Sequence, residues 1–290
     1  MQNLKCIVAA TDFSDAAGRA VSRAALIARQ QGAELHLLHV ISPLALYPGM
    51  DIDPGMDETR LATARSPLDA AARDLQERFG IRAQVAQRIG RVHSQIAEYA
   101  STVAADLVVA GALGKSILPR LLLGSTAWRL LRVCPCPVLI VRNEPAEVYR
   151  QVLAAVDFFP HTRAVAEWAS RLACDGHLQL LHVLEPMDDS ALRYTGPNAA
   201  TAIRQRREEM RAIAENLMAN LRSSLPGEVE SRIETGYPPA LILACAPSWR
   251  AELIVLGRAG RGGLERLLLG SVSKNVAQAA ECDVLVAGAD

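Results

Sequence analysis

The stretch DLVVAGALGKSILPRLLLGST, residues 106–126, returns almost in register as ELIVLGRAGRGGLERLLLGSV, residues 252–272. Each copy opens with a short apolar run and then spaces its glycines as Gly-x2-Gly-x9-Gly-Ser. A single glycine-rich turn is weak evidence of function. Two copies with identical spacing, each behind an apolar run, indicate a duplicated functional loop.

The duplication extends beyond this loop. Residues 37–40 and 180–183 both read LLHV, and residues 10–13 (ATDF) return in the same order as residues 155–158 (AVDF). A proline and polar residues separate the two copies at Asn143–Ala146. The sequence therefore predicts two tandem domains, residues 1–145 and residues 146–290.

Short β-branched runs alternate with longer stretches of helical period in each half, which is typical of βαβ units around a parallel sheet. Ser14 is an expected helix N-cap, and Gly32 and Gly80 stand where C-terminal glycines belong. We expect crossover helices over residues 58–79 and 201–225, with right-handed connections. The prediction is an α/β fold of two tandem repeats, each a doubly wound, five-stranded parallel sheet with helices on both faces. In the first repeat the expected strands are residues 6–10, 34–40, 83–89, 107–110 and 138–141.

Charge and composition narrow the class of protein. The chain has 31 Lys and Arg against 31 Asp and Glu, so it has no basic excess for nucleic acid. The first apolar run is too short for a secretory segment, and no later run reaches membrane-spanning length. We expect a cytoplasmic protein that binds neither nucleic acid nor membrane.

The six cysteines show neither the density of a disulfide scaffold nor paired zinc spacing. Reduced thiols are expected, and no metal site is predicted. Cys134 and Cys136, separated only by Pro135, could be a metal or redox pair, but one intervening residue is a poor spacing for zinc and no His lies close in sequence. They are interpreted as small buried residues that lead into a strand.

Candidate ligand-binding residues follow from the predicted topology. In an open parallel sheet, ligands bind beyond the carboxyl ends of the strands, where strand order reverses. Asp12 and Asp157 follow the first strand of each repeat, and Gly111 and Gly257 end the fourth. Glycines let backbone N–H groups approach an anion, and Gly-Ser before a helix puts free amides and a hydroxyl at its N-terminus. Each repeat is therefore predicted to cradle a phosphate.

The loop spacing, together with an Asp after the first strand, resembles the nucleotide-binding signature of the universal stress protein family. The sequence CPVL at residues 136–139 also resembles the final strand of that family. The likeness covers nearly the whole chain, twice. It implies a Rossmann-like, adenine nucleotide alpha hydrolase-like fold that binds ATP, accompanied by Mg²⁺, and serves as a nucleotide-dependent regulator in the stress response.

In family members that bind ATP, the Asp and a main-chain position after the second strand hold the adenosine, and the glycine loop holds the phosphates. Carried over, the first site comprises Asp12, Val40, Gly111, Gly114, Gly124, Ser125 and Thr126. The second comprises Asp157, Val183, Gly257, Gly260, Gly270, Ser271 and Val272.

The same resemblance implies that the final strands of the two repeats, Val138–Val141 and Val284–Ala287, pair within the chain as a built-in dimer. Self-association into a homodimer of chains stays open, as does the identity of a regulatory protein partner.

Both halves depart from the family pattern. Phe158, Phe159 and Pro160 follow Asp157, and their rings are either core or walls that narrow a nucleoside pocket. The first loop runs Gly114-Lys115-Ser116. The sequence does not rank the two sites.

Gly114-Lys115-Ser116 resembles the end of a Walker A loop, but Val109 stands where that motif needs its first glycine, so an ordinary P-loop is rejected. Lys115, Arg258 and Arg261 are interpreted as solvated loop cations, and contact with a phosphate is the alternative.

His39 and His182 are interpreted as hydrogen-bonding residues at strand ends, without a catalytic role. For Asp12 and Asp157, a role in helix entry is the alternative to nucleoside binding.

No catalytic motif names a reaction, so no catalytic residue is assigned and any ATP hydrolysis would be slow. The alternative function is an interaction module of the same fold that binds no nucleotide. An adenylating enzyme would need glycines directly after the first strand, and Thr11–Ser14 contains none.

Overall fold

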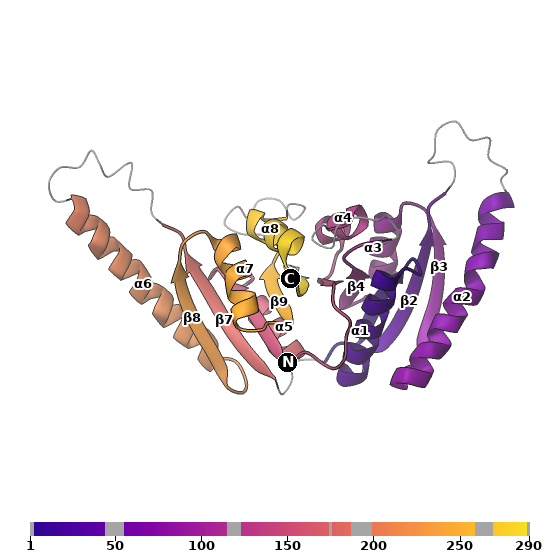
Figure 1. Cartoon of the computed structure of the whole chain (residues 1–290), viewed down its shortest axis with the longest axis horizontal. Coiled ribbons are helices and arrows are strands. Elements are labelled where there is room, and N and C mark those ends of the chain that lie inside the picture. Colours follow the sequence, from indigo (N-terminus) through magenta and orange to yellow (C-terminus); the bar gives the residue numbers. More distant parts are fainter. Residues whose placement is uncertain are drawn as a thin grey trace.

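The computed structural model describes residues 3–43, 55–114, 123–173, 176–186, 199–258 and 269–288. Its elements alternate between strand and helix through both halves (Figure 1). The first half contains β1 (Cys6–Thr11), α1 (Asp15–Gln31), β2 (Glu34–Ile41), α2 (Gly55–Phe79), β3 (Ala83–Ile89), α3 (Val92–Thr102), β4 (Leu107–Gly111), α4 (Ser125–Val133) and β5 (Val138–Val141). The second half contains β6 (Gln151–Val156), α5 (Thr162–Ala173), β7 (His177–Leu184), α6 (Ala199–Ser223), β8 (Val229–Thr235), α7 (Pro238–Ser248), β9 (Leu253–Gly257), α8 (Ser271–Ala279) and β10 (Asp283–Ala287).

The predicted α/β architecture of two tandem repeats is confirmed. Each strand expected in the first half is present, with bounds that differ by at most one residue. Local signals explain this agreement. The Ser14 side chain accepts a hydrogen bond from the Ala17 amide at 3.2 Å and so starts α1. Gly32 and Gly80, with φ of 68° and 70°, adopt the left-handed conformation that follows a helix end.

The strands of both halves form one sheet of ten strands among the described residues, in the order β3-β2-β1-β4-β5-β10-β9-β6-β7-β8. Strands are parallel within each half. At the centre β5 and β10 pair antiparallel, with Leu139 opposite Leu285. The predicted pairing of the final strands is therefore confirmed, and it removes one exposed edge from each half. Figure 1 shows the outcome, with α2 and α6 at opposite ends of the molecule.

Helices cover both faces of the sheet, and each face has a continuous apolar core. One cluster packs residues of α1, α2, α5 and α6 against the sheet, and it includes Leu139 and Leu285 from the central strands. The other packs α3, α4, α7 and α8, and it includes Ile140 and Val284. Because both clusters run through β5 and β10, the core is shared by the two halves.

A buried polar group also joins the halves. The carboxylate of Asp283, on β10, accepts hydrogen bonds from the Arg142 amide at 2.8 Å, the Asn143 amide at 3.2 Å and the Tyr149 hydroxyl at 2.6 Å. The guanidinium of Arg23, on α1, lies 3.5 Å from the same carboxylate and 3.9 Å from the centre of the Tyr149 ring. Burial raises the pKa of Asp283, although these hydrogen bonds and Arg23 act in the opposite direction.

In the described parts of the chain, no helix is both long enough and apolar enough to cross a membrane.

Candidate functional site

The two candidate sites lie where strand order reverses. In the first half β1 is flanked by β2 and β4, and in the second β6 is flanked by β7 and β9. Asp12 directly follows β1 and Gly111 ends β4, while Asp157 and Gly257 take the matching places after β6 and at the end of β9. Each Asp thus stands next to the start of its glycine loop, at the edge where open α/β sheets bind ligands.

In the first half, Asp12 and Gly114 come into close contact. One carboxylate oxygen of Asp12 accepts hydrogen bonds from the Ser14 amide at 3.0 Å and the Ser14 hydroxyl at 2.5 Å. The other, Oδ2, lies 3.0 Å from the point where a Cβ on Gly114 would stand. A side chain at position 114 would press on this carboxylate. Both interpretations of Asp12 therefore have support, since one oxygen shapes the helix entry and the other faces the loop.

Gly111 is required by the packing of the backbone. A Cβ at this position would lie 2.8 Å from the carbonyl oxygen of Ala16, in the first turn of α1. The end of β4 therefore approaches α1 closely enough to exclude any side chain. Gly111 supports the fold whether or not it also touches a ligand.

The two ends of each loop are held together by the same backbone contact. Gly124 donates from its amide to the carbonyl of Ala112 at 2.8 Å, and Gly270 donates to the carbonyl of Arg258 at 2.8 Å. This hydrogen bond brings the N-termini of α4 and α8 back to the ends of β4 and β9. The duplicated spacing in the sequence therefore corresponds to a duplicated loop closure.

The helices that follow begin at Ser125 and Ser271, with Gly124 and Gly270 at the N-cap positions. No side chain among the described residues caps either N-terminus. The first amides of these helices, including those of Thr126 and Val272, are therefore left for an anion or for water.

Val40 and Val183 lie inside strands rather than after them, each at the last position but one of β2 and β7. Val40 pairs with Arg88 of β3, and it lies one residue beyond the last pair between β2 and β1. Val183 occupies the same place in the second half. The main chain of both residues therefore extends past the neighbouring central strand, toward the candidate site.

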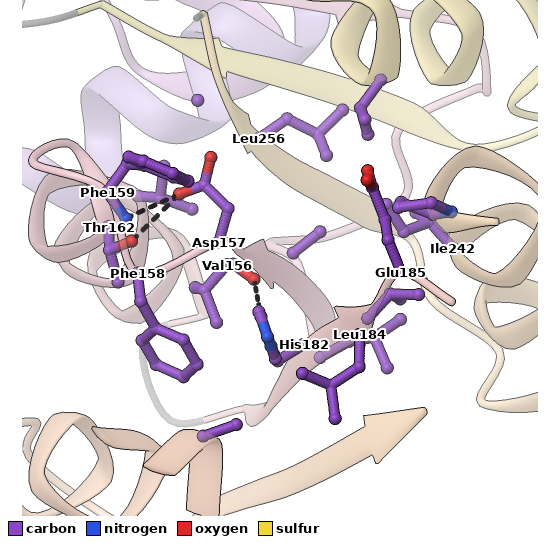
Figure 2. A pocket seen from close by; sticks show the side chains of 18 of the residues that line it. Val156, Asp157, Phe158, Phe159, Thr162, His182, Leu184, Glu185, Ile242 and Leu256 are labelled. Atoms are coloured by element: carbon purple, nitrogen blue, oxygen red, sulfur yellow. Dashed lines mark hydrogen bonds between the residues drawn. The ribbon is translucent and has the colours of Figure 1, made fainter. Parts of the chain in front are cut away.

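A cavity of about 860 Å³ opens at this edge in the second half (Figure 2). It brings together six of the predicted site residues: Asp157, Val183, Gly257, Gly270, Ser271 and Val272. The seventh, Gly260, lies outside the described residues. The second-site residues predicted from dispersed motifs thus line one cavity, to the extent that the structure describes them.

Asp157 stands at one wall of this cavity. Its Oδ1 accepts hydrogen bonds from the Phe159 amide at 3.1 Å and the Thr162 hydroxyl at 3.2 Å, which shape the entry to α5. In Figure 2, Glu185 extends from the end of β7 on the opposite side of the cavity. Acidic side chains on two walls suit a ligand that presents hydroxyl or amino donors.

The aromatic residue after each Asp adopts the same unusual conformation. Phe13 and Phe158 have φ of 63° and 60°, in the left-handed region that side chains rarely occupy. The centre of the Phe13 ring lies 4.5 Å from the centre of the His39 ring, and the Phe158 and His182 ring centres are also 4.5 Å apart. Phe158 packs against the core and also lines the cavity, whereas Phe159 is a residue of the cavity lining.

The hydrogen bonds predicted for His39 and His182 are present. The Nδ1 atom of His39 lies 2.8 Å from the carbonyl oxygen of Thr11, and that of His182 lies 2.8 Å from the carbonyl oxygen of Val156. Each histidine thus bridges two neighbouring strand ends and supports the Phe ring beside it.

Apolar residues form much of the remaining wall, and no sequence motif predicted them. Leu184, Ile242 and Leu256 come from β7, α7 and β9. Met210, Ile213, Ala214 and Leu217 come from α6. Such residues carry no chemical signature in the sequence, because an apolar position in a helix or strand reads as core. An apolar cavity with a few polar groups is the usual form of a small-molecule site.

One prediction about the loops is wrong. Arg258 is not a solvated cation, since its side chain is part-buried and one guanidinium nitrogen donates to the carbonyls of Cys134 at 2.7 Å and Cys136 at 3.3 Å. Antiparallel pairing of β5 and β10 brings Cys134 and Cys136 of the first half against Arg258 of the second. Lys115 and Arg261 lie outside the described residues.

Within the described ranges, no group of three His, Cys, Asp or Glu residues is arranged to hold a metal ion.

Comparison with known proteins places the chain in a family. The pattern of the universal stress protein family matches residues 3–142 and again residues 148–288. A universal stress protein of Mycolicibacterium smegmatis is 30% identical over 293 residues, which cover 97% of this chain and 96% of that protein. One from Mycobacterium tuberculosis H37Rv is 31% identical over 301 residues, covering 97% and 95%.

The chain belongs to the universal stress protein family. It is a tandem member, since the family pattern is present twice. The crystal structure of a universal stress protein from Archaeoglobus fulgidus matches this tandem member with a TM-score of 0.72 at 25% identity, covering 98% of each chain. A functionally unknown protein from Pseudomonas aeruginosa matches with a TM-score of 0.72 at 22% identity, covering 100% of this chain and 94% of that one, which shows a shared fold.

Proposed function

We propose that this tandem universal stress protein binds ATP, accompanied by Mg²⁺, and acts in the cytoplasm as a nucleotide-dependent regulator of the stress response. The observation that carries the proposal is the second-half cavity, where an acidic side chain, an apolar pocket and an uncapped helix N-terminus meet at the strand-order reversal. The domains would be residues 1–145 and residues 146–290, each with one candidate site, and at least one of the two binds ATP.

Size and chemistry support a nucleotide in this cavity. Its volume of about 860 Å³ falls within the range of small-molecule sites. Leu184, Ile242 and Leu256 offer apolar walls to a base, and Asp157 offers carboxylate oxygens to hydroxyl or amino donors. The amides at the start of α8 offer donors to phosphate. Together these groups match the three parts of an adenine nucleotide.

The residues that would hold ATP in the second half are Asp157 and Val183 at the nucleoside, with Gly257, Gly260, Gly270, Ser271 and Val272 at the phosphates. In the first half the proposal assigns Asp12 and Val40 to the nucleoside and Gly111, Gly114, Gly124, Ser125 and Thr126 to the phosphates. The contact between Asp12 and the loop at Gly114 supports the first site. Bound ATP would supply the negative charge that the loop amides attract, and it would carry its own Mg²⁺.

The test is calorimetric titration of the purified chain, stripped of nucleotide, with ATP and Mg²⁺. Asp157→Asn and Asp12→Asn assign the sites, because the amide keeps the size and one acceptor oxygen but loses the charge. We expect each variant to weaken binding at its own site by about tenfold to hundredfold. Glu228→Gln is the matched control, because this exposed carboxylate precedes β8 at the opposite edge of the sheet.

An exposed apolar face on α6 favours the alternative, an interaction module of the same fold. Ile213 is 56% exposed and Leu217 is 42% exposed, one helical turn apart at the cavity wall. Absence of any saturable heat with ATP would overturn the nucleotide proposal and favour docking of a protein partner at this face.

A further inference from the structure

Two thiols meet directly before β5. Cys134 ends α4 and Cys136 lies two residues later, and their sulfur atoms are 3.7 Å apart. Residues two apart in a chain cannot separate their Cα atoms by more than about 7 Å, which is close to the upper end of the disulfide range. Rotation of the side chains with a small backbone adjustment therefore brings the sulfurs to bonding distance.

The two thiols differ in exposure and share a hydrogen bond. Cys134 is fully buried, whereas Cys136 is half-buried. The hydrogen bond between them stabilises the anion of whichever sulfur has lost its proton, and the Arg258 guanidinium acts to lower the pKa of both thiols. The pair is therefore easier to ionise than an isolated buried thiol, and Cys136 is the sulfur that solvent reaches.

Other described cysteines lack these features. Burial raises the pKa of Cys6 to about 11 and that of Cys282 to about 12, and it also raises the pKa of Cys245. A thiol with a raised pKa holds its proton and is a poor nucleophile. Reactivity is therefore expected to concentrate at the Cys134–Cys136 pair.

The duplication provides an internal comparison. In the second half Ala280 and Cys282 occupy the positions that match Cys134 and Cys136. Cys282 directly precedes β10, and Ala280 lies two residues earlier. Ala280 ends α8 with nearly the same backbone angles that Cys134 has at the end of α4. The fold therefore forms this corner without a second thiol, and packing alone does not require the pair.

We propose that Cys134 and Cys136 form a dithiol that a hydroperoxide oxidises reversibly to an intrachain disulfide. The half-buried Cys136 is the sulfur that a hydroperoxide reaches. As the thiolate, it attacks one oxygen of the O–O bond and becomes a sulfenic acid, while the other oxygen leaves, with a proton, as water or an alcohol. The adjacent Cys134 sulfur then attacks the sulfenic sulfur, forms the S–S bond and releases water. The sulfurs together lose two electrons, and the hydroperoxide gains them.

Reversal requires only a thiol reductant. The disulfide would enclose a single residue, Pro135, so it restricts the unfolded chain little and gains little stability from loop closure. Partial exposure of Cys136 gives a reductant access to one sulfur. Such a bond is a labile modification rather than a structural cross-link.

The experiment treats the reduced full chain with hydrogen peroxide, labels remaining thiols with N-ethylmaleimide in denaturant, and maps tryptic peptides by mass spectrometry. Cleavage after Arg132 and Arg142 puts both thiols, and no other cysteine, in the peptide Val133–Arg142. We expect this peptide to lose two hydrogen atoms and to carry no label. Dithiothreitol before labelling should restore two labels.

Cys134→Ala gives this corner the residue that the second half already has, so folding should be preserved, and it should abolish the loss of two hydrogens. Cys282→Ala is the matched control and should leave the disulfide yield unchanged. Oxidised methionines elsewhere in the chain show that the peroxide has acted. If both thiols still carry labels in such a sample, the proposal is overturned. Direct conversion to sulfinic or sulfonic acid, or a chain-to-chain disulfide on a non-reducing gel, would also overturn it.

Discussion

Removal of one hydroxyl group from the junction between the halves should destabilise the whole protein. The Tyr149→Phe substitution keeps the buried ring and its contact with Arg23, and it deletes only the hydrogen bond of 2.6 Å from the Tyr149 hydroxyl to Asp283. Both residues are almost fully inaccessible to solvent. Water therefore cannot replace the lost donor without a rearrangement of the core.

The magnitude follows from the charge of the acceptor. A hydrogen bond to a buried charged group contributes about 1.5–3 kcal/mol, and the amides of Arg142 and Asn143 still reach Asp283 in the variant. We therefore expect the free energy of unfolding to fall by about 2 kcal/mol. Loss of the donor also raises the pKa of Asp283 further. The difference in unfolding free energy between the wild-type protein and Tyr149→Phe should therefore shrink as the pH falls and Asp283 becomes protonated.

The assay is urea denaturation followed by far-ultraviolet circular dichroism, at neutral pH and again under mildly acidic conditions. Tyr237→Phe is the matched control, because this hydroxyl is on a side chain that is 60% exposed and meets only Asn275 at 3.2 Å among its described partners. We expect the control to change stability by less than about 0.5 kcal/mol. A Tyr149→Phe effect as small as that of the control would refute the reasoning.

Two further predictions concern the fold beneath the first site. Gly111→Ala should lower the free energy of unfolding by about 1–3 kcal/mol, because its Cβ would meet the Ala16 carbonyl at 2.8 Å. Gly18→Ala, in open space on α1, should raise the free energy of unfolding by about 0.5–1 kcal/mol. If urea denaturation gave the same change for both variants, the close approach of Gly111 to Ala16 would be contradicted. Burial lowers the pKa of His36 below its usual value of 6.5 in the folded protein. The His36 side chain therefore binds a proton at a higher pH in the unfolded chain than in the folded one, and the free energy of unfolding should fall as the pH drops below about 6.5. A pH series of unfolding free energies checks this, and a slope that is unchanged in His36→Gln would count against it.

Much of the architecture could be predicted from the sequence because its signals are local. Alternating strand and helix patterns predicted the β-strands of the first half, Ser14 and Gly32 marked the ends of α1, and the repeated glycine spacing predicted two equivalent loops. These patterns act over a few residues through backbone geometry and capping. They can therefore be recognised in the sequence without knowing which distant segments pack against them.

Contacts across the sheet were decided only by the tertiary structure. The solvated role predicted for Arg258 was wrong because β5 and β10 bring its guanidinium to the carbonyls of Cys134 and Cys136. The same pairing carries Asp283 to Tyr149. No local pattern encodes these meetings, since each joins residues more than a hundred positions apart.

The candidate site divides in the same way. By itself, the sequence determined the strand-end Asp residues and the duplicated glycine loops, since both follow from a topology that local patterns specify. Only the tertiary structure decided which apolar residues of α6 and α7 wall the cavity and that Gly111 must lack a side chain. The physical reason is that both depend on the volume left between packed elements, which is set by where distant segments come to rest.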